Sequence, residues 1–141
     1  MKSIALNSTA ASPANDQSAS LRILIAEDND TMRRLLAFVL RADGHDIVEA
    51  RTGADVLEAL AEALTSEGEL DFDAILSEQT LPGLNGLTVL AGVRARGHAT
   101  PFVLITADPD VQDQARRLHG VVLDQPFNAQ AIRAAVASST R

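Results

Sequence analysis

Arg22-Ile-Leu-Ile-Ala-Glu27-Asp28 is a continuous apolar run that ends in two acidic residues. A second run of the same kind is Phe102-Val-Leu-Ile-Thr106. Both runs are hydrophobic throughout rather than at alternate positions. This pattern is typical of central strands in a parallel sheet that is covered on both faces. The two runs therefore favour a fold in which helices cover a parallel sheet.

Working outward from these runs, five strands alternate with five segments of helical spacing. We predict strands at Leu21–Ala26, Asp46–Glu49, Ala74–Ser77, Phe102–Thr106 and Val121–Leu123, and the polar second one is expected at an edge. We predict helices at Asp30–Arg41, Ala54–Leu64, Leu87 to about Gly97, Asp108 to about Gly120 and Ala129–Ala137, with Thr65–Asp73 as a surface loop. Right-handed crossovers then favour an α/β fold with a doubly wound five-stranded parallel sheet, flavodoxin-like (βα)5, in the strand order 2-1-3-4-5. Apolar helix residues such as Met32 and Phe38 are interpreted as core.

Length and composition predict one domain. The 141 residues are 46% hydrophobic, enough for one core. Residues 21–141 are expected to form this domain, and residues 1–20, rich in Ala, Ser and Asn at Asn7–Ser20, are expected to be a disordered N-terminal tail. The start at Met1 and the polar end at Ser138–Arg141 are consistent with a whole protein.

Charge and residue usage exclude several classes of function. With 12 basic and 19 acidic residues, the formal charge is −7, which argues against nucleic acid as a partner. The chain has no cysteine, and the apolar stretch at Met1–Leu6 is too short for a signal peptide or a membrane span. We therefore expect a cytoplasmic protein that does not contact membranes.

Polar residues follow four of the predicted strands. Glu27 and Asp28 follow the first strand, Glu78 the third and Gln125 the fifth, while Thr106 ends the fourth. In a doubly wound sheet, ligands bind beyond the carboxyl ends of the strands. These five side chains are therefore expected to meet at one rim of the sheet.

Four separated motifs together resemble the receiver domain of bacterial two-component response regulators. The first motif is the run Arg22–Asp28 quoted above. The other three are Asp73-Ala-Ile-Leu-Ser-Glu78-Gln-Thr-Leu-Pro82-Gly-Leu-Asn-Gly86, Val103-Leu-Ile-Thr106-Ala107 and Gln125-Pro126-Phe127. The resemblance covers about Leu21 to Ala137. It implies that Glu27 and Asp28 match an acidic pair that holds magnesium, that Thr106 matches a hydroxyl that reads the phosphoryl group, and that Pro82 and Gly86 match the loop after the third strand. It also implies that the bond before Pro126 is commonly cis.

The same resemblance shows departures at the residues tied most closely to phosphoryl transfer. Glu78 stands where the family has its acceptor aspartate, and Gln125 stands where it has a lysine. Val122 replaces the usual aromatic switch residue, and the fourth helix is expected to be trimmed. These departures predict a pseudo-receiver, a non-enzymatic protein-interaction module in two-component signalling that acts independently of phosphorylation.

Alternatives remain open at this stage. Glu78 either mimics phosphorylation and locks an active-like state or is inert, and Thr106 either reads a phosphoryl group or is a strand-end threonine bonded to the backbone. A working phosphoacceptor receiver is a second interpretation, although Asp73, the nearest other carboxylate, is expected at the far end of its strand. A third interpretation is a divalent-cation sensor in which Glu27, Asp28 and Glu78 bind magnesium or calcium. Partners are expected to be a histidine kinase or a downstream effector, and a homodimer is compatible with the sequence.

Overall fold

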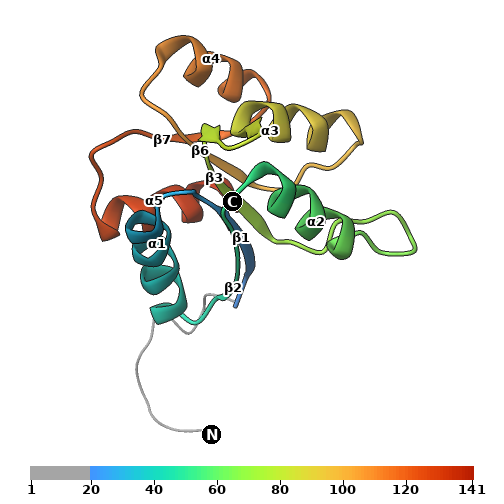
Figure 1. Ribbon diagram of the computed structural model, residues 1–141, viewed down its shortest axis with the longest axis horizontal. Helices are drawn as coiled ribbons and strands as arrows, with labels where there is room; N and C mark the ends of the chain where they lie inside the picture. The colour runs from blue at the N-terminus through green and yellow to red at the C-terminus, as the bar shows by residue number, and fades with distance from the viewer. Residues whose placement is uncertain (1–19) are drawn as a thin grey trace, which may run out of the picture.

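The computed structural model describes residues 20–141 and contains the expected parallel sheet (Figure 1). Its strands are β1 (Arg22–Ala26), β2 (Asp46–Ala50), β3 (Ala74–Glu78), β6 (Phe102–Ile105) and β7 (Val121–Leu123). They lie in the order β2-β1-β3-β6-β7, and every neighbouring pair is parallel. The flavodoxin-like order and the edge position of Asp46–Ala50 are confirmed. The predicted disordered tail lies outside the described residues, apart from Ser20.

Five helices cover the two faces of this sheet. They are α1 (Asp30–Ala42), α2 (Gly53–Ala63), α3 (Gly86–Ala95), α4 (Pro109–Arg117) and α5 (Ala129–Ser139). Each begins after a residue whose side chain accepts a hydrogen bond from a backbone N–H of the first turn, namely Asn29, Thr52, Asn85, Asp108 and Asn128. These caps fix where each helix starts, and all five predicted helices are confirmed to within a few residues.

The central strand β1 shows why the apolar runs are continuous. Its Ile23 and Ile25 pack into the layer formed with α1 and α5, whereas Leu24 packs into the layer with α2, α3 and α4. All three side chains are completely buried. Both faces of the sheet therefore need apolar residues, and Figure 1 shows α1 and α5 on one side of the strands and α2 and α3 on the other.

One element of the fold was not predicted. Thr80–Leu81 (β4) and Leu84–Asn85 (β5) pair as a small antiparallel hairpin, and Gly83 in its turn has φ +82°. A glycine tolerates this left-handed conformation without steric cost. Strands of two residues are too short to show an alternating pattern, so periodicity could not predict them. The predicted surface loop between α2 and β3 also contains a bridge between Leu64 and Leu70.

The interpretation of Phe38 as a core residue was wrong, because 73% of its surface is exposed. In α1, the buried Leu36 and Leu40 lie four residues apart and face the sheet, and Phe38 lies two residues from each of them. Residues two apart on a helix do not share a face, so Phe38 points outward. Met32, in contrast, packs against the core as predicted.

Three leucines of the predicted helix stripes are also exposed. Leu35 in α1 and Leu57 and Leu64 in or beside α2 retain 41%, 58% and 47% of their surface. The stripes are thus wider than the faces that the sheet can cover. Within residues 20–141, no helix is both long and apolar enough to cross a membrane.

Candidate acidic site at the carboxyl ends of the strands

The parallel ladder brings Glu27, Asp28, Glu78, Thr106 and Gln125 to one edge of the sheet, which we call the rim. Backbone bonds continue the ladder beyond the strands: Glu27 N–H donates to Ala50 O at 3.0 Å, and Thr106 N–H donates to Leu123 O at 3.2 Å. Each side chain is therefore held at a fixed height above the strand ends. The expected convergence of the five residues is what the structure shows.

Glu27 is the most deeply buried acid at the rim, with only 3% of its surface exposed. Its carboxylate accepts a hydrogen bond from Asn29 N–H at 3.0 Å, and its main-chain carbonyl accepts one from the Arg33 guanidinium at 3.1 Å. The pKa of Glu27 is raised to about 7, mainly by burial and also by the nearby Glu78 carboxyl, against the opposing hydrogen bond from Asn29 N–H. The side chain therefore takes up a proton close to neutral pH.

Glu78 ends β3 and faces Glu27. One carboxylate oxygen accepts from Gln79 N–H at 3.1 Å, and the other accepts from the Gln125 amide at 3.4 Å. Burial raises the pKa of Glu78, while hydrogen bonds from Glu27 and the backbone lower it. The two carboxyl groups lie close enough for each to affect the pKa of the other: Glu78 raises the pKa of Glu27, and Glu27 lowers the pKa of Glu78.

Positive charge does not offset the acids at the rim. Among residues 20–141, Glu27, Asp28 and Glu78 form no salt bridge. The buried Arg33 is near, but it pairs with Asp30 and Glu49 at 2.8 and 3.1 Å. Gln125 offers one long hydrogen bond and no charge, which is a weak substitute for a charge-assisted contact.

The residues present do not fit a metal centre in this arrangement. Within the described part of the chain, no three His, Cys, Asp or Glu side chains are placed so that they could hold a metal ion. The Glu27 and Glu78 carboxyl groups instead lie close enough to shift the pKa of each other. Cation binding by Glu27, Asp28 and Glu78 stays a prediction, and it would need these side chains to turn.

Thr106 is buried at the end of β6 and has a local partner for its hydroxyl. The hydroxyl oxygen accepts from Asp108 N–H at 3.1 Å, and the Thr106 carbonyl accepts from the Gln112 amide at 2.9 Å. Both bonds tie the strand end to the start of α4. Val122, in β7, is partly buried and packs against the α2, α3 and α4 layer. The role of either residue in read-out stays a prediction.

The loop that follows Glu78 is shaped by close backbone contacts. A Cβ atom at Gly86 would lie 2.5 Å from Leu104 Cδ1 and 2.7 Å from Glu78 O, so only glycine fits there. Pro82 O accepts from Gly53 N–H at 2.8 Å and ties the hairpin to α2. The peptide bond before Pro126 is cis, as the family resemblance implied.

Two residues that support the site were missed by the sequence analysis. The Gln79 side chain accepts from Leu87 N–H at 2.9 Å and so holds the start of α3 beside Glu78. Arg33 fixes Glu27 through its carbonyl. The sequence did hold a signal for Arg33: it lies three positions after Asp30, a spacing at which opposite charges on a helix can pair.

Asp73, the alternative acceptor, lies at the opposite end of β3 from Glu78. Its carboxylate accepts from Arg22 N–H at 2.8 Å, at the start of β1. The length of both strands therefore separates it from the rim.

Residues 23–137 match the family model described as the response regulator receiver domain. Among curated proteins, the chain is 31% identical over 126 residues to the transcriptional regulatory protein TcrA of Mycobacterium tuberculosis, covering 87% of this chain and 47% of that protein. It is 32% identical over 123 residues to the DNA-binding response regulator MtrA of Mycolicibacterium smegmatis, covering 85% of this chain and 50% of MtrA. The chain thus spans about half the length of these relatives.

Solved structures show the same fold. The chemotaxis response regulator CheY4 of Vibrio cholerae superposes with a TM-score of 0.72 at 19% identity, covering 86% of this chain and 99% of that chain. The receiver domain of the hybrid histidine kinase CckA superposes with a TM-score of 0.65 at 26% identity, covering 85% and 99%.

Proposed function

We propose that this chain, which belongs to the family of response regulator receiver domains, is a pseudo-receiver: a phosphorylation-independent protein-interaction module in two-component signalling. The observation that carries the proposal is the carboxyl pair at the rim. Glu78 stands where the family has its acceptor, it lies beside the buried Glu27, and within residues 20–141 its amide partner is Gln125 and not a lysine. The module is not an enzyme in this proposal.

Phosphoryl transfer to a carboxylate needs an in-line nucleophile and positive charge for the transferring oxygens. Glu78 is one methylene longer than aspartate, and both of its carboxylate oxygens already accept hydrogen bonds. The pKa of Glu78, which burial raises, further reduces its value as an anionic nucleophile. Gln125 supplies no charge. Each of these features supports an inactive acceptor site.

A protein partner is favoured by the outer face of α1. Phe38 is 73% exposed there, beside the partly exposed Leu35. Together with Arg34, Arg41, Ala42 and Glu49, Phe38 lines a shallow cavity of about 460 Å3. An aromatic side chain beside arginines is typical of the residues that anchor protein interfaces. The proposed partner is a histidine kinase or a downstream effector in the cytoplasm. In a homodimer, a second copy of the chain would contact the same outer face of α1 around Phe38.

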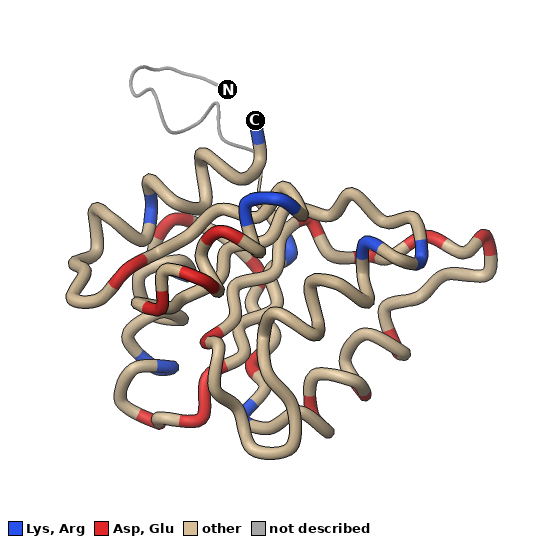
Figure 2. Tube along the Cα trace, turned by 90° about the horizontal axis from the view of Figure 1, so that it is seen from above, with Lys and Arg blue, Asp and Glu red and all other residues tan. Residues whose placement is uncertain are grey.

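Nucleic acid is not the proposed partner of this domain. The formal charge of the chain is −7, and in Figure 2 the Lys and Arg positions of residues 20–141 are spread over the trace with Asp and Glu among them. Phosphate contacts that dominate DNA affinity need clustered positive charge. Relatives named as transcriptional or DNA-binding regulators are about twice as long as this chain, and the name of each applies to the whole protein.

The test is intact mass after incubation with acetyl phosphate and magnesium. The wild type is expected to gain nothing, and the double variant Glu78→Asp with Gln125→Lys is expected to gain the mass of one phosphoryl group. The matched control is Glu78→Ala with Gln125→Lys, which restores the charge without a carboxylate and should gain nothing. Uptake by the wild type would contradict the proposal, and adding Asp73→Asn would then show whether Asp73 is the acceptor.

A further inference from the structure

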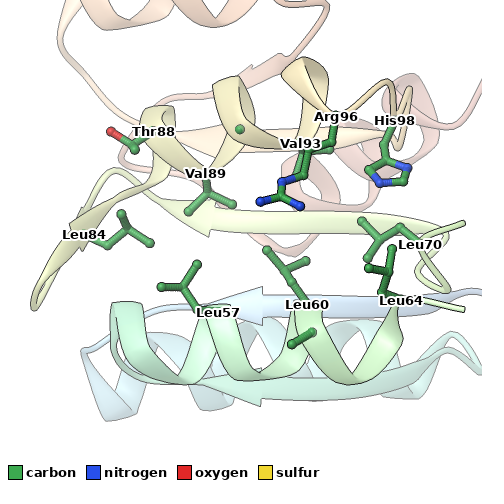
Figure 3. Close-up of a pocket in the computed structure, with 12 residues that line it drawn as sticks. Leu57, Leu60, Leu64, Leu70, Leu84, Thr88, Val89, Val93, Arg96 and His98 are labelled. Atoms are coloured by element: carbon green, nitrogen blue, oxygen red, sulfur yellow. The ribbon is translucent and has the colours of Figure 1, made fainter. Parts of the chain in front are cut away.

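An apolar opening lies away from the rim, between α2 and α3. It is a groove with a volume of about 440 Å3. Figure 3 shows Leu57, Leu60 and Leu64 pointing from the α2 side toward α3, and Val89 and Val93 pointing back. Small-molecule sites typically have volumes of roughly 300–1,000 Å3 and mostly apolar walls. The groove has the size and the lining of such a site.

The edge of the groove carries two exposed leucines. Leu57 retains 58% of its surface and Leu64 retains 47%. Leaving a leucine side chain in water forgoes roughly 1.5–3 kcal/mol of hydrophobic stabilisation. Two such residues on one groove indicate that an apolar group covers them when the groove is filled.

Gly92 keeps the groove open from the α3 side. It lies within α3, where glycine is less favourable than alanine by about 1 kcal/mol. A Cβ atom at Gly92 would meet nothing within 4 Å, and its φ is not in the left-handed region, so neither packing nor backbone conformation requires a glycine. Gly86 at the start of the same helix differs, because backbone and Leu104 press against it. What Gly92 provides is empty space in the groove.

Charge in the groove is positive and is not neutralised by its surroundings. Arg96 points from α3 into the space between the helices, with His98 beside Leu70 at one end (Figure 3). Arg96 forms no salt bridge within residues 20–141. Its neighbour Arg94 has a different role, since its guanidinium donates to the carbonyls of Leu118, His98 and Thr100 and thereby fixes the end of α3. A guanidinium without a partner above an apolar floor complements a carboxylate on an aliphatic chain.

We propose that the groove between α2 and α3 binds a small anionic amphiphile, a medium-chain carboxylate whose aliphatic tail covers Leu57, Leu60 and Leu64 and whose carboxylate pairs with Arg96. The site is separate from the rim and does not depend on the proposed pseudo-receiver function. His98 supplies a further hydrogen-bonding group at one end of the groove.

Decanoate is the probe, added below its micelle concentration to the 15N-labelled full chain and followed by amide chemical shifts. Saturable shifts are expected at the groove residues, with none for decanol at the same concentration. Gly92→Leu fills the groove and is expected to weaken binding about tenfold or more, and Arg96→Gln about fivefold. Arg117→Gln makes the same charge change at an exposed position on α4, outside the groove, and should leave the affinity unchanged.

Ala61→Leu fills the groove from α2, so the test does not depend on one variant folding. Unchanged binding by both filled variants, or equal shifts with decanol, would overturn the proposal. Sedimentation velocity is run beside the titration. If the wild type self-associates and Gly92→Leu makes it monomeric, the groove is an interface between copies of the chain, and the ligand assignment is wrong.

Discussion

The acidic side chains at the two ends of the sheet have opposite environments. At the amino ends of the strands, Asp73 accepts from the Arg22 backbone at 2.8 Å and Asp46 pairs with the Arg22 guanidinium at 3.3 Å, all near the surface. At the carboxyl ends, Glu27 is buried beside Glu78, and within residues 20–141 neither forms a salt bridge. One end offsets its charges, and the other holds carboxyl groups at a cost in stability.

This difference indicates which end carries function. Buried carboxyl groups with shifted pKa values tend to mark functional sites, although structural networks can shift them too. The backbone around Glu78 keeps the frame that the family resemblance implied, with Gly86 in close contact and a cis bond before Pro126. In the proposed pseudo-receiver, this frame is retained while Glu78 and Gln125 stand in place of the residues that carry phosphoryl chemistry.

Breaking the frame should have the largest effect. In Gly86→Ala the added methyl would meet Leu104 and the Glu78 carbonyl, so we expect a loss of about 3 kcal/mol in the free energy of unfolding. The measurement is urea unfolding followed by circular dichroism, since the chain has no Trp or Tyr. Gly92→Ala is the matched control and should gain about 0.5–1 kcal/mol. Equal effects of the two variants would show that the close contact at Gly86 is not a constraint.

Removing the buried arginine that supports the rim should be the next largest change. Arg33→Met takes away the partner of Asp30 and Glu49 and the donor to Glu27 O. Because Asp30 is half exposed, we expect the free energy of unfolding to fall by about 2 kcal/mol, which is less than for a fully buried ion pair. Arg34→Met, at the exposed neighbouring position, should change stability by less than about 0.5 kcal/mol. A loss no larger than that of the control would mean that Arg33 does not hold the rim.

The rim should also make stability depend on pH. The pKa of Glu27 is raised from 4.5 to about 7 in the folded state, so the folded state binds a proton that the unfolded state has released. Stability from this group is fully present below pH 4.5 and is lost as the pH rises to about 7. Glu27→Gln should remove this loss, on the order of 1–3 kcal/mol. Unfolding curves at several pH values compare the two proteins, and parallel pH profiles would contradict the assignment.

The smallest effect is expected at the amino end of the sheet. Arg22→Gln removes an exposed pair with Asp46 and a contact with the Phe72 ring at 5.3 Å. Exposed ion pairs of this kind contribute roughly 0–1 kcal/mol to stability. We therefore expect the free energy of unfolding to fall by about 0.5 kcal/mol, and by less at high salt. A loss as large as that of Arg33→Met would remove the contrast between the two ends.

The sequence predicted the strand order, the helices and the convergence at the rim, because continuous apolar runs and helix caps are local signals. It did not predict the hairpin of β4 and β5, whose strands are too short to show a period. It placed Phe38 in the core because hydrophobic spacing does not reveal which part of a stripe the sheet covers. Nor could it predict that Glu27 and Glu78 shift the pKa of each other, since this depends on side-chain directions across two strands.

The most direct test of the central claim is the amide spectrum of the 15N-labelled wild type, recorded alone, with magnesium and then with acetyl phosphate. We predict that the signals of Glu27, Asp28, Glu78 and Thr106 do not move in either step, because the rim neither accepts phosphoryl nor needs a cation. Shifts at these residues with magnesium alone would indicate a cation site. Further shifts at Thr106 after acetyl phosphate would show a working receiver and would contradict the account.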